Sequence, residues 1–289
     1  MTGSTSKNKK YASGEDSQRA PRRGGTIVVK VVLNCFIRHH ILIISGAAIT
    51  ILLGIWWIAA FVIDATIILP PPPAVGRELW ALLNSNDFWH SVGLTVFRGL
   101  SGFFISLSLG IVLGIAAGIS LPIHALFKPL IAVIRTTPIM SVILIALLWF
   151  KTGTVPIFSS FLIAFPVITQ NVIVGIRQTD QKLLQMGRAY GLSATRRLLH
   201  ISVPSVVPYL ISGAQTALGL TWKVVVAAEV LSIPNWGVGS EMQLSQMSLE
   251  TAQVFAWTVV AILLSAASQW VLSMSIRSMS WSKAYADTV

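Results

Sequence analysis

Cysteine and charge are both scarce in this chain. Its 289 residues include one cysteine, Cys35, which excludes an intrachain disulfide and a cysteine-based metal cluster. Charged residues make up 11% of the chain and hydrophobic residues 54%, with a mean hydropathy of +0.74. Because a soluble globular domain needs more charge than this, the composition predicts a membrane protein.

The signatures of catalysis are missing as well. The sequence has no Gly-Lys pair and so lacks the phosphate-binding loop that holds ATP in many proteins. It offers no Ser-His-Asp set and no pair of acids in the context of an active site. Of the five histidines, His39 and His40 are adjacent and point to different sides of a helix, while the others lie in separate connectors. We therefore expect no enzymatic activity, no metal site and no cofactor bound by this chain.

Acidic residues are fewer than basic ones, with 10 Asp and Glu against 21 Lys and Arg and a net charge of +11. The basic residues flank apolar runs and are not gathered on a polar module with exposed aromatic side chains. Nucleic acid is therefore not an expected partner.

Six apolar runs are long enough to cross a bilayer, which requires roughly 20 residues per helix. We expect an all-α integral membrane protein with six transmembrane helices. A break is expected in the third of them, near its inner end, where the sequence reads Arg135-Thr-Thr-Pro138. The predicted spans cover residues 41–63, 91–119, 129–150, 157–178, 206–231 and 253–275.

The distribution of charge predicts the orientation of the spans. Lysines and arginines gather before the first span and between the fourth and fifth, and acids gather after the first and fifth. By the positive-inside rule both termini are cytoplasmic. We expect a basic, disordered tail over residues 1–38, a six-span domain over 39–276 and a cytoplasmic tail over 277–289.

The second span carries a small residue at every fourth position: Gly102, Ser106, Gly110, Gly114 and Gly118. Small side chains let membrane helices approach closely, so this seam predicts helix packing. A smooth seam also allows one helix to slide on another, which leaves a role in motion open.

Polar residues within spans are candidates for a translocation pathway, because each is costly unless it faces protein or water. For Arg98 and Lys223 the alternatives are structural pairing or snorkelling to the interface. Lys223 and Glu229 lie six residues apart, about 120° around a helix, so each needs a partner of its own. Cationic groups along a pathway favour a small anion. The candidates are Arg98, Gln170, Asn171, Ser212, Thr216, Lys223 and Glu229.

A polar, basic segment separates the fourth and fifth spans. Thr179 and Asp180 are expected to cap a helix that continues through Tyr190. Gly191 is expected to end that helix in the left-handed conformation, and Ser193 to cap a second helix. Pro204 is expected to stop that second helix. We interpret the segment as a docking surface; an amphipathic connector on lipid headgroups is the alternative.

This segment resembles the cytoplasmic loop of the permease subunit of ATP-binding-cassette importers of the nitrate, sulfonate and taurine group. That loop has an acidic residue, two alanines, a glycine and a downstream aliphatic-proline pair. Gly191 matches the glycine and Val203-Pro204 the pair, within the pattern RAYGLS at residues 188–193. Where the family usually has Glu-Ala-Ala, residues 185–187 read Gln-Met-Gly, so a charged contact would become a neutral hydrogen bond. The similarity extends over roughly the last two hundred residues.

The resemblance implies a MetI-like helical bundle in the bacterial inner membrane. It implies a second permease copy, separate ATPase subunits that bind ATP and Mg, and an external solute-binding protein. The expected solute is nitrate, a sulfonate or taurine, and a thiamine-precursor pyrimidine is the alternative. A gradient-driven carrier is the alternative of another class. The implied ATPase-coupling residues are Gln185, Met186, Gly187, Arg188, Ala189, Gly191, Leu192, Ser193 and Pro204.

Overall fold

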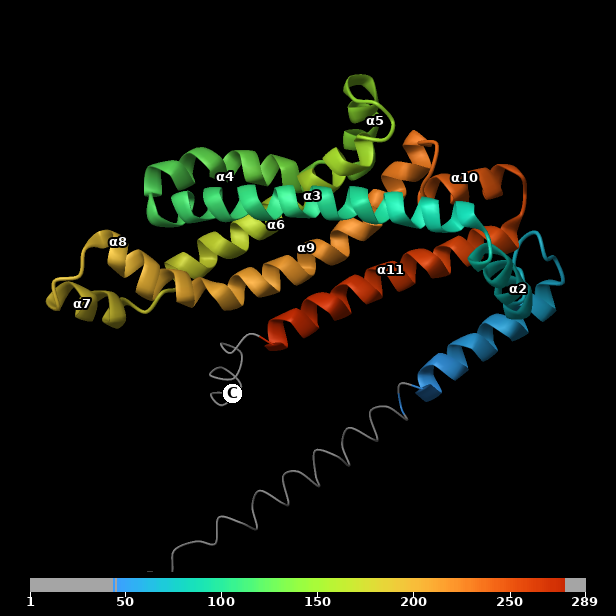
Figure 1. The fold of residues 1–289 in the computed structure, drawn as a ribbon, viewed down its shortest axis with the longest axis horizontal. Coiled ribbons are helices and arrows are strands. Elements are labelled where there is room, and N and C mark those ends of the chain that lie inside the picture. Colours follow the sequence, from blue (N-terminus) through green and yellow to red (C-terminus); the bar gives the residue numbers. More distant parts are fainter. Residues whose placement is uncertain (1–43, 45, 279–289) are drawn as a thin grey trace, which may run out of the picture. The chain divides into compact units, whose positions relative to one another are not determined.

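The computed structural model describes residue 44 and residues 46–278, with side chains through Ile276. All the regular structure in these residues is helical (Figure 1). The predicted tail over residues 1–38 and most of the tail over 277–289 lie outside the described residues. The chain divides into two units, one ending at Ile55 and one beginning at Trp56, and the site described below lies entirely in the second.

By length and apolar composition, five helices are candidates to cross a membrane. Each overlaps one of the predicted spans, which confirms the all-helical membrane fold. The first, Gly46–Ile63, runs through the boundary between the two units. The others are α3 (Asn86–Ile119), α6 (Val155–Arg177), the helix that ends as α9 (Val203–Ser232), and α11 (Thr251–Ser278).

The third predicted span, residues 129–150, is not one straight helix. It is divided between α4 (Leu121–Thr136) and α5 (Ile139–Trp149), which meet at a bend of 99°. The break lies at Pro138, as expected, because a proline pushes the preceding residue into an extended conformation. Thr137 has ψ 128° and its hydroxyl donates to the Val133 carbonyl at 2.7 Å, which ends α4. A sixth crossing therefore exists only if this bent pair forms it.

The seam of small residues on α3 lies against α6. A Cβ added at Gly114 would come within 2.6 Å of Val172 Cβ, and one at Gly110 within 2.9 Å of Ile168 Cγ2. The Ser106 hydroxyl donates across the contact to the Phe161 carbonyl at 3.0 Å. Because side chains of ordinary size cannot fit here, the two backbones approach closely, as the spacing predicts.

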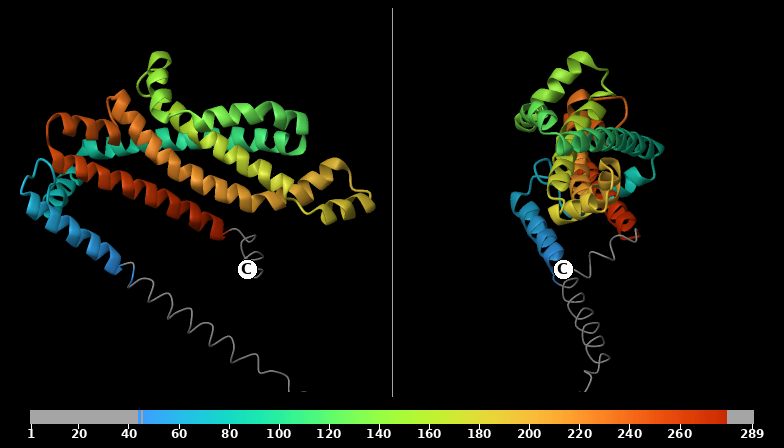
Figure 2. Two further views of the ribbon diagram at one scale, coloured as in Figure 1. Left: turned by 180° about the vertical axis from the view of Figure 1, so that it is seen from behind. Right: turned by 90° about the vertical axis from the view of Figure 1, so that its left-hand side faces the viewer.

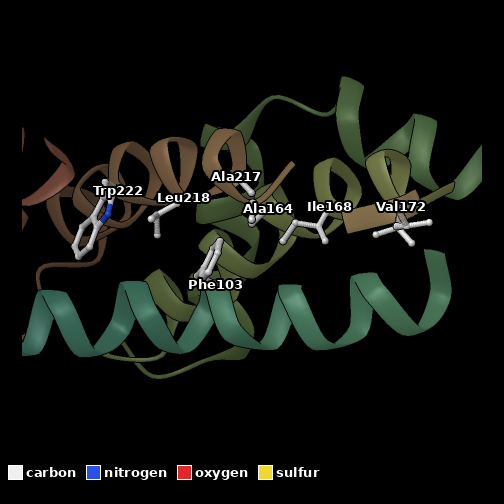
Figure 3. Packing of buried hydrophobic residues seen from close by; sticks show 9 residues of the cluster. Phe103, Ala164, Ile168, Val172, Ala217, Leu218 and Trp222 are labelled. Carbon is white, nitrogen blue, oxygen red and sulfur yellow. The ribbon is translucent and has the colours of Figure 1, made fainter. Parts of the chain in front are cut away.

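The core of this unit lies where α3, α6 and α9 meet. Phe103 from α3 points toward Ala164 and Ala217, and Trp222 packs farther along α9 (Figure 3). The benzene edge of Trp222 fills the space beside Gly99, whose added Cβ would be 3.3 Å away. These contacts hold α9, which carries most of the candidate pathway residues, in a fixed rotation against α3 and α6.

Short helices lie at both ends of the long ones. Figures 1 and 2 show α7 (Gln181–Ala189) and α8 (Ala194–Arg197) at one end, and α2 (Pro72–Leu83) and α10 (Val238–Met247) at the other. Basic residues mark the first end, among them Arg177, Lys182 and Arg188, whereas the second carries Glu78, Glu241 and Glu250. The two ends therefore differ in the sign of their charge.

Candidate functional site

The segment over residues 179–205, called the coupling segment below, folds as a helical hairpin. Asp180 caps α7 by accepting a hydrogen bond from the Lys182 amide at 2.8 Å, and Ser193 caps α8 by accepting one from the Arg196 amide at 3.3 Å. Both caps were predicted, whereas Thr179, also predicted to cap α7, instead donates its hydroxyl to the Gly175 carbonyl at 3.4 Å. The side-chain oxygens satisfy amides that have no partner within the helix, so the sequence itself sets where each helix begins.

Gly191 ends α7 with φ +70°, which confirms the predicted left-handed residue. The Leu192 amide donates to the Gly187 carbonyl at 2.9 Å and the Gly191 amide to the Arg188 carbonyl at 3.0 Å. This pair of bonds is the Schellman motif, in which a glycine satisfies the last carbonyls of a helix. The chain turns back on itself within a few residues, so α7 and α8 form a short, tightly connected unit.

One face of α7 packs onto the helix that follows. Gly187 is buried, and an added Cβ would lie 3.0 Å from Ile201 Cδ1 and 3.3 Å from Arg197 Cδ. The Arg197 guanidinium donates to the Leu192 carbonyl at 2.6 Å, which fastens the turn to the same helix. These contacts join α7 and the turn after it to the beginning of the long helix.

Another face of α7 is apolar and exposed. The side chains of Leu183, Met186 and Tyr190 are 43%, 52% and 80% exposed. They are spaced three and four residues apart, so they share one side of the helix. Large apolar side chains grouped on an otherwise polar, basic element are typical of a surface that another protein or a membrane covers. Gln185, Arg188, Ala189 and Ser193 are exposed beside them, and Leu192 is half-buried.

The prediction that Pro204 stops the second helix was wrong. The helix runs from Ala194 to Ser232 through a π-helical turn, Leu198–Ser202, and Pro204 occupies the first turn of α9. A proline removes one backbone donor and its ring crowds the carbonyl four residues earlier. The wider π turn immediately before Pro204 shifts the bonding pattern, so the helix continues past the proline.

Arg98 and Glu229, both predicted pathway candidates, pair with each other. Arg98 Nη1 lies 2.6 Å from Glu229 Oε1, and this is the one ion pair among the described residues. Arg98 Nη1 also donates to the Trp236 carbonyl at 2.6 Å, and the Gly239 amide donates to Glu229 Oε2 at 3.0 Å. Neither side chain has a free charge for a solute, so we assign the pair to the structure that joins α3, α9 and α10.

Thr95 completes this Arg98–Glu229 cluster. Its hydroxyl lies 2.9 Å from Glu229 Oε2 and accepts from the Val238 amide at 2.9 Å. The segment before α10 fits closely over the pair, since a Cβ at Gly237 would lie 2.7 Å from Glu229 Cδ. Sequence reasoning missed Thr95; it lies one helical turn before Arg98, and that spacing is the available signal.

The remaining pathway candidates lie on two helices. On α9, Ser212, Thr216 and Lys223 are exposed along one side. On α6, Gln170 and Asn171 are half-buried. Asn171 donates to the Val167 carbonyl at 2.8 Å and packs against Gly213, where an added Cβ would be 2.7 Å from Asn171 Cβ. Asn171 therefore has a packing role between α6 and α9, while the α9 stripe stays open.

A groove of about 560 Å³ runs between α9 and α11 beside this stripe. Its polar lining consists of Lys223 from α9 and three residues of α11, namely Thr258, Ser265 and Gln269. The part of the chain that the structure describes contains no group of three or more His, Cys, Asp or Glu residues that could hold a metal ion.

Comparison of the sequence with known protein families shows which family this chain belongs to. The family described as "Binding-protein-dependent transport system inner membrane component" matches residues 110–281, more than half of the chain. The chain belongs to this family. It is a permease subunit of an ABC importer, and the alternative of a gradient-driven carrier is wrong.

Individual relatives of the chain are transport permeases as well. The permease is 32% identical over 189 residues to the aliphatic sulfonates transport permease protein SsuC of Escherichia coli, covering 64% of this chain and 69% of that one. It is 26% identical to SsuC of Bacillus subtilis, covering 71% and 74%, and 29% identical to the bicarbonate permease CmpB of Synechococcus elongatus, covering 54% and 56%. The coupling segment lies within the family match.

A solved structure confirms the fold. The permease resembles an amino acid ABC transporter with a TM-score of 0.54 at 14% identity, covering 66% of this chain and 91% of that one. A similarity at this identity carries the arrangement of helices and nothing further. As a permease of an ABC importer, the chain implies an ATPase and a solute-binding protein as partners.

Glu241 gives the permease a pH dependence of its own. It lies in α10, outside the candidate spans, and burial raises the pKa of its carboxyl above the ordinary 4.5; a hydrogen bond from Ser91 opposes this shift and the nearby Asp87 adds to it. Because a raised pKa means that the folded protein disfavours the carboxylate, stability falls as pH rises from the ordinary value through the raised one. Glu241→Gln removes this dependence. Between pH 4 and pH 8 the melting temperature of the purified native protein should therefore fall more, relative to its value at pH 4, than that of Glu241→Gln, with Glu250→Gln as an exposed control.

Proposed function

We propose that this permease forms the translocation pathway for a small anionic solute and is driven by separate ATPase subunits that dock on α7. ATP and Mg bind to those subunits and not to this chain. Two copies of the permease form the pathway between them within a bacterial inner membrane. The basic end of the molecule, with the coupling segment and both termini, faces the cytoplasm, which follows from the positive-inside rule.

The observation that carries the docking proposal is the division of α7 into two faces. Its buried face, at Gly187, rests on Ile201 and Arg197 of the following helix, and its exposed face presents Leu183, Met186 and Tyr190. A partner that covers the exposed face gains apolar burial, about 25 cal/mol for each Å² removed from water. The same contact gives that partner a direct mechanical connection to the long helix.

The mechanism follows from the continuity of that helix. When the ATPases close on nucleotide, they push α7, and Gly187 and Arg197 transfer the push to the segment around Ile201. The helix then runs without interruption to Ser232, past the open stripe at Ser212, Thr216 and Lys223. A tilt of this helix therefore changes access to the pathway, and the π turn at Leu198–Ser202 is the point at which it bends.

The solute class rests on the relatives. The relatives SsuC and CmpB are named for sulfonates and bicarbonate. A nitrate permease, NrtB of Synechococcus elongatus, is 34% identical to this chain over 139 residues. All of these are small oxyanions. We extend that class to this chain; which member it carries is set by its solute-binding protein.

The docking proposal is tested by placing a charge on the exposed face of α7. Met186→Asp should reduce recovery of the ATPase with the purified permease by about tenfold or more, because an aspartate at the centre of an apolar contact forfeits at least 1.4 kcal/mol. Tyr190→Asp should act in the same direction. Recovery of the ATPase and ATP-dependent uptake by reconstituted vesicles are the measurements.

Gln181→Asp is the matched control. Gln181 is exposed on the same helix, about 140° away from Met186, so the variant adds the same charge outside the proposed contact. It should leave both measurements at the native level. If Met186→Asp and Tyr190→Asp retain the ATPase and transport as fast as Gln181→Asp, the docking face has been assigned to the wrong surface.

A further inference from the structure

Lys223 differs from Arg98 because it has no counter-charge among the described residues. Arg98 has its charge balanced by Glu229 at 2.6 Å. Lys223 lies in the same set of helices, is exposed, and has no hydrogen bond or ion pair among the described residues. The residues that line the α9–α11 groove include no acid. An ammonium group inside a membrane span is costly without a counter-charge, so something outside this chain's described residues must compensate it.

Lys223 lies inside a candidate membrane span, and its position works against snorkelling of the ammonium group to the membrane surface. It is nine residues before Ser232, the last residue of α9, which places it about 14 Å from that end at 1.5 Å per residue. Side chains on a helix lean toward its N-terminus. Lys223 therefore leans away from the nearer end of α9 and toward the middle of the helix, which opposes snorkelling to the nearer surface.

The surrounding residues offer further hydrogen-bond donors. Gln269 on α11 lines the same groove, and its amide nitrogen lies 3.2 Å from Ser265 Oγ, which leaves the Ser265 hydroxyl free to donate. A positive charge together with unpaired donors is the arrangement that an oxyanion satisfies.

From these observations we infer that Lys223 is the residue of the pathway that recognises the negative charge of the solute, with Gln269 and Ser265 of α11 as neighbouring donors. The ligand is a small oxyanion, such as a sulfonate, nitrate or a carboxylate. This inference rests on the proposed function and sharpens it, because Arg98 is paired with Glu229 and Lys223 is the cation that remains among the described pathway candidates. In a two-fold symmetric pair the two copies face each other with the same surface, so each would contribute one Lys223 to the shared pathway.

The local charge is measurable without transport. In a Cys35→Ser background, Gln269→Cys places a single thiol at the groove. Its rates of modification by an anionic and a cationic methanethiosulfonate reagent are compared in purified, reconstituted permease with its ATPase. The anionic-to-cationic rate ratio should fall at least tenfold when Lys223→Gln is added, and Lys223→Arg should preserve it. An unchanged ratio in Lys223→Gln overturns the inference.

Lipid is the rival source of a counter-charge, and the same assay distinguishes it. The ratio is measured in vesicles of phosphatidylcholine alone and with 30% phosphatidylglycerol, a composition chosen on the order of bacterial anionic lipid content. A ratio independent of this change supports a groove that excludes lipid. A high ratio seen only without phosphatidylglycerol means that an anionic lipid headgroup neutralises Lys223, and that result also overturns the inference.

Transport separates failure of this inference from failure of the proposed function. With 15N-nitrate, 14C-bicarbonate and 35S-taurine as probes, the native complex should take up at least one of them in an ATP-dependent way. Lys223→Gln should reduce that uptake at least tenfold while ATPase recovery stays native; if Lys223→Gln does not assemble, Lys223→Met replaces it. Native uptake in the variant overturns the role of Lys223 and leaves the proposed function standing. Absence of uptake of every probe by the native complex overturns the anion assignment itself.

Discussion

Glu229→Ala should destabilise the folded permease by about 3–5 kcal/mol, the typical cost of removing one partner from a buried ion pair. Glu229 is 0% exposed, and its loss leaves the Arg98 guanidinium without a counter-charge between α3 and α9. The Gly239 amide loses its acceptor at the same time. A lower melting temperature in detergent and a lower yield from membranes are the expected readings.

Replacing both partners separates the charge effect from the shape effect. Arg98→Met with Glu229→Leu removes the stranded charge, so it should recover most of the lost stability, less the cost of the unpaired Gly239 amide and Trp236 carbonyl. Glu250→Ala, at an exposed acid, should leave the melting temperature unchanged. If Glu229→Ala melts with the native protein, or if the double variant is less stable than Glu229→Ala, the pair does not stabilise this fold as we describe.

The long-range pairing in this cluster was beyond what the sequence could supply. Counting along α9 correctly separated Lys223 from Glu229, because six residues place them on different sides of one helix. The partner of Glu229 lies on α3, more than a hundred residues away, and no local spacing indicates which helices meet. Arg98 and Lys223 looked equivalent as cations in apolar spans, and only the packing of α3 against α9 distinguishes them.

Local signals were reliable where a single residue decides the backbone. Asp180, Ser193 and Gly191 were predicted to cap and end helices, and each does so, because a side-chain oxygen or the absence of a Cβ acts within a few residues. The prediction for Pro204, made with the same kind of reasoning, was wrong. Its usual effect is cancelled by the π turn before it, and such a turn depends on how the hairpin packs onto Ile201 rather than on the proline alone.

The seam of small residues on α3 could be predicted from the sequence for a related reason. Four-residue spacing of small side chains is a property of one helix, so the sequence shows it without knowledge of the partner. The identity of the partner helix is a tertiary fact, and α6 supplies it through Ile168, Val172 and Ile176. The exposed stripe at Leu183, Met186 and Tyr190 was readable in the same way but is meaningful only once the opposite face of α7 is known to be buried.

Gly114→Leu should prevent α3 and α6 from packing at this point of the seam. Even the Cβ of an alanine at this position would lie 2.6 Å from Val172 Cβ and 3.1 Å from the Thr169 carbonyl oxygen, and the backbone oxygen cannot rotate away. Overpacking of this kind typically costs about 1–3 kcal/mol for a small addition and more for a larger one. Gly114→Ala should therefore lower the melting temperature measurably, and Gly114→Leu should abolish recovery of folded protein.

An exchange of side chains tests whether the contact with Val172 is the cause. Val172→Gly removes the two nearest atoms that an alanine at position 114 would meet and leaves the Thr169 carbonyl oxygen. Gly114→Ala combined with Val172→Gly should therefore be more stable than the sum of the two single effects predicts, by about 1 kcal/mol or more in a double-mutant cycle. Gly93→Ala is the control on the same helix, because nothing lies within 4 Å of its added Cβ and alanine favours the helix over glycine. Additive single effects, or a loss of stability in Gly93→Ala equal to that in Gly114→Ala, would mean that the α3–α6 contact does not determine the outcome. A positive coupling instead locates the cost in the contact between these two helices, against which α9 and its open polar stripe are packed.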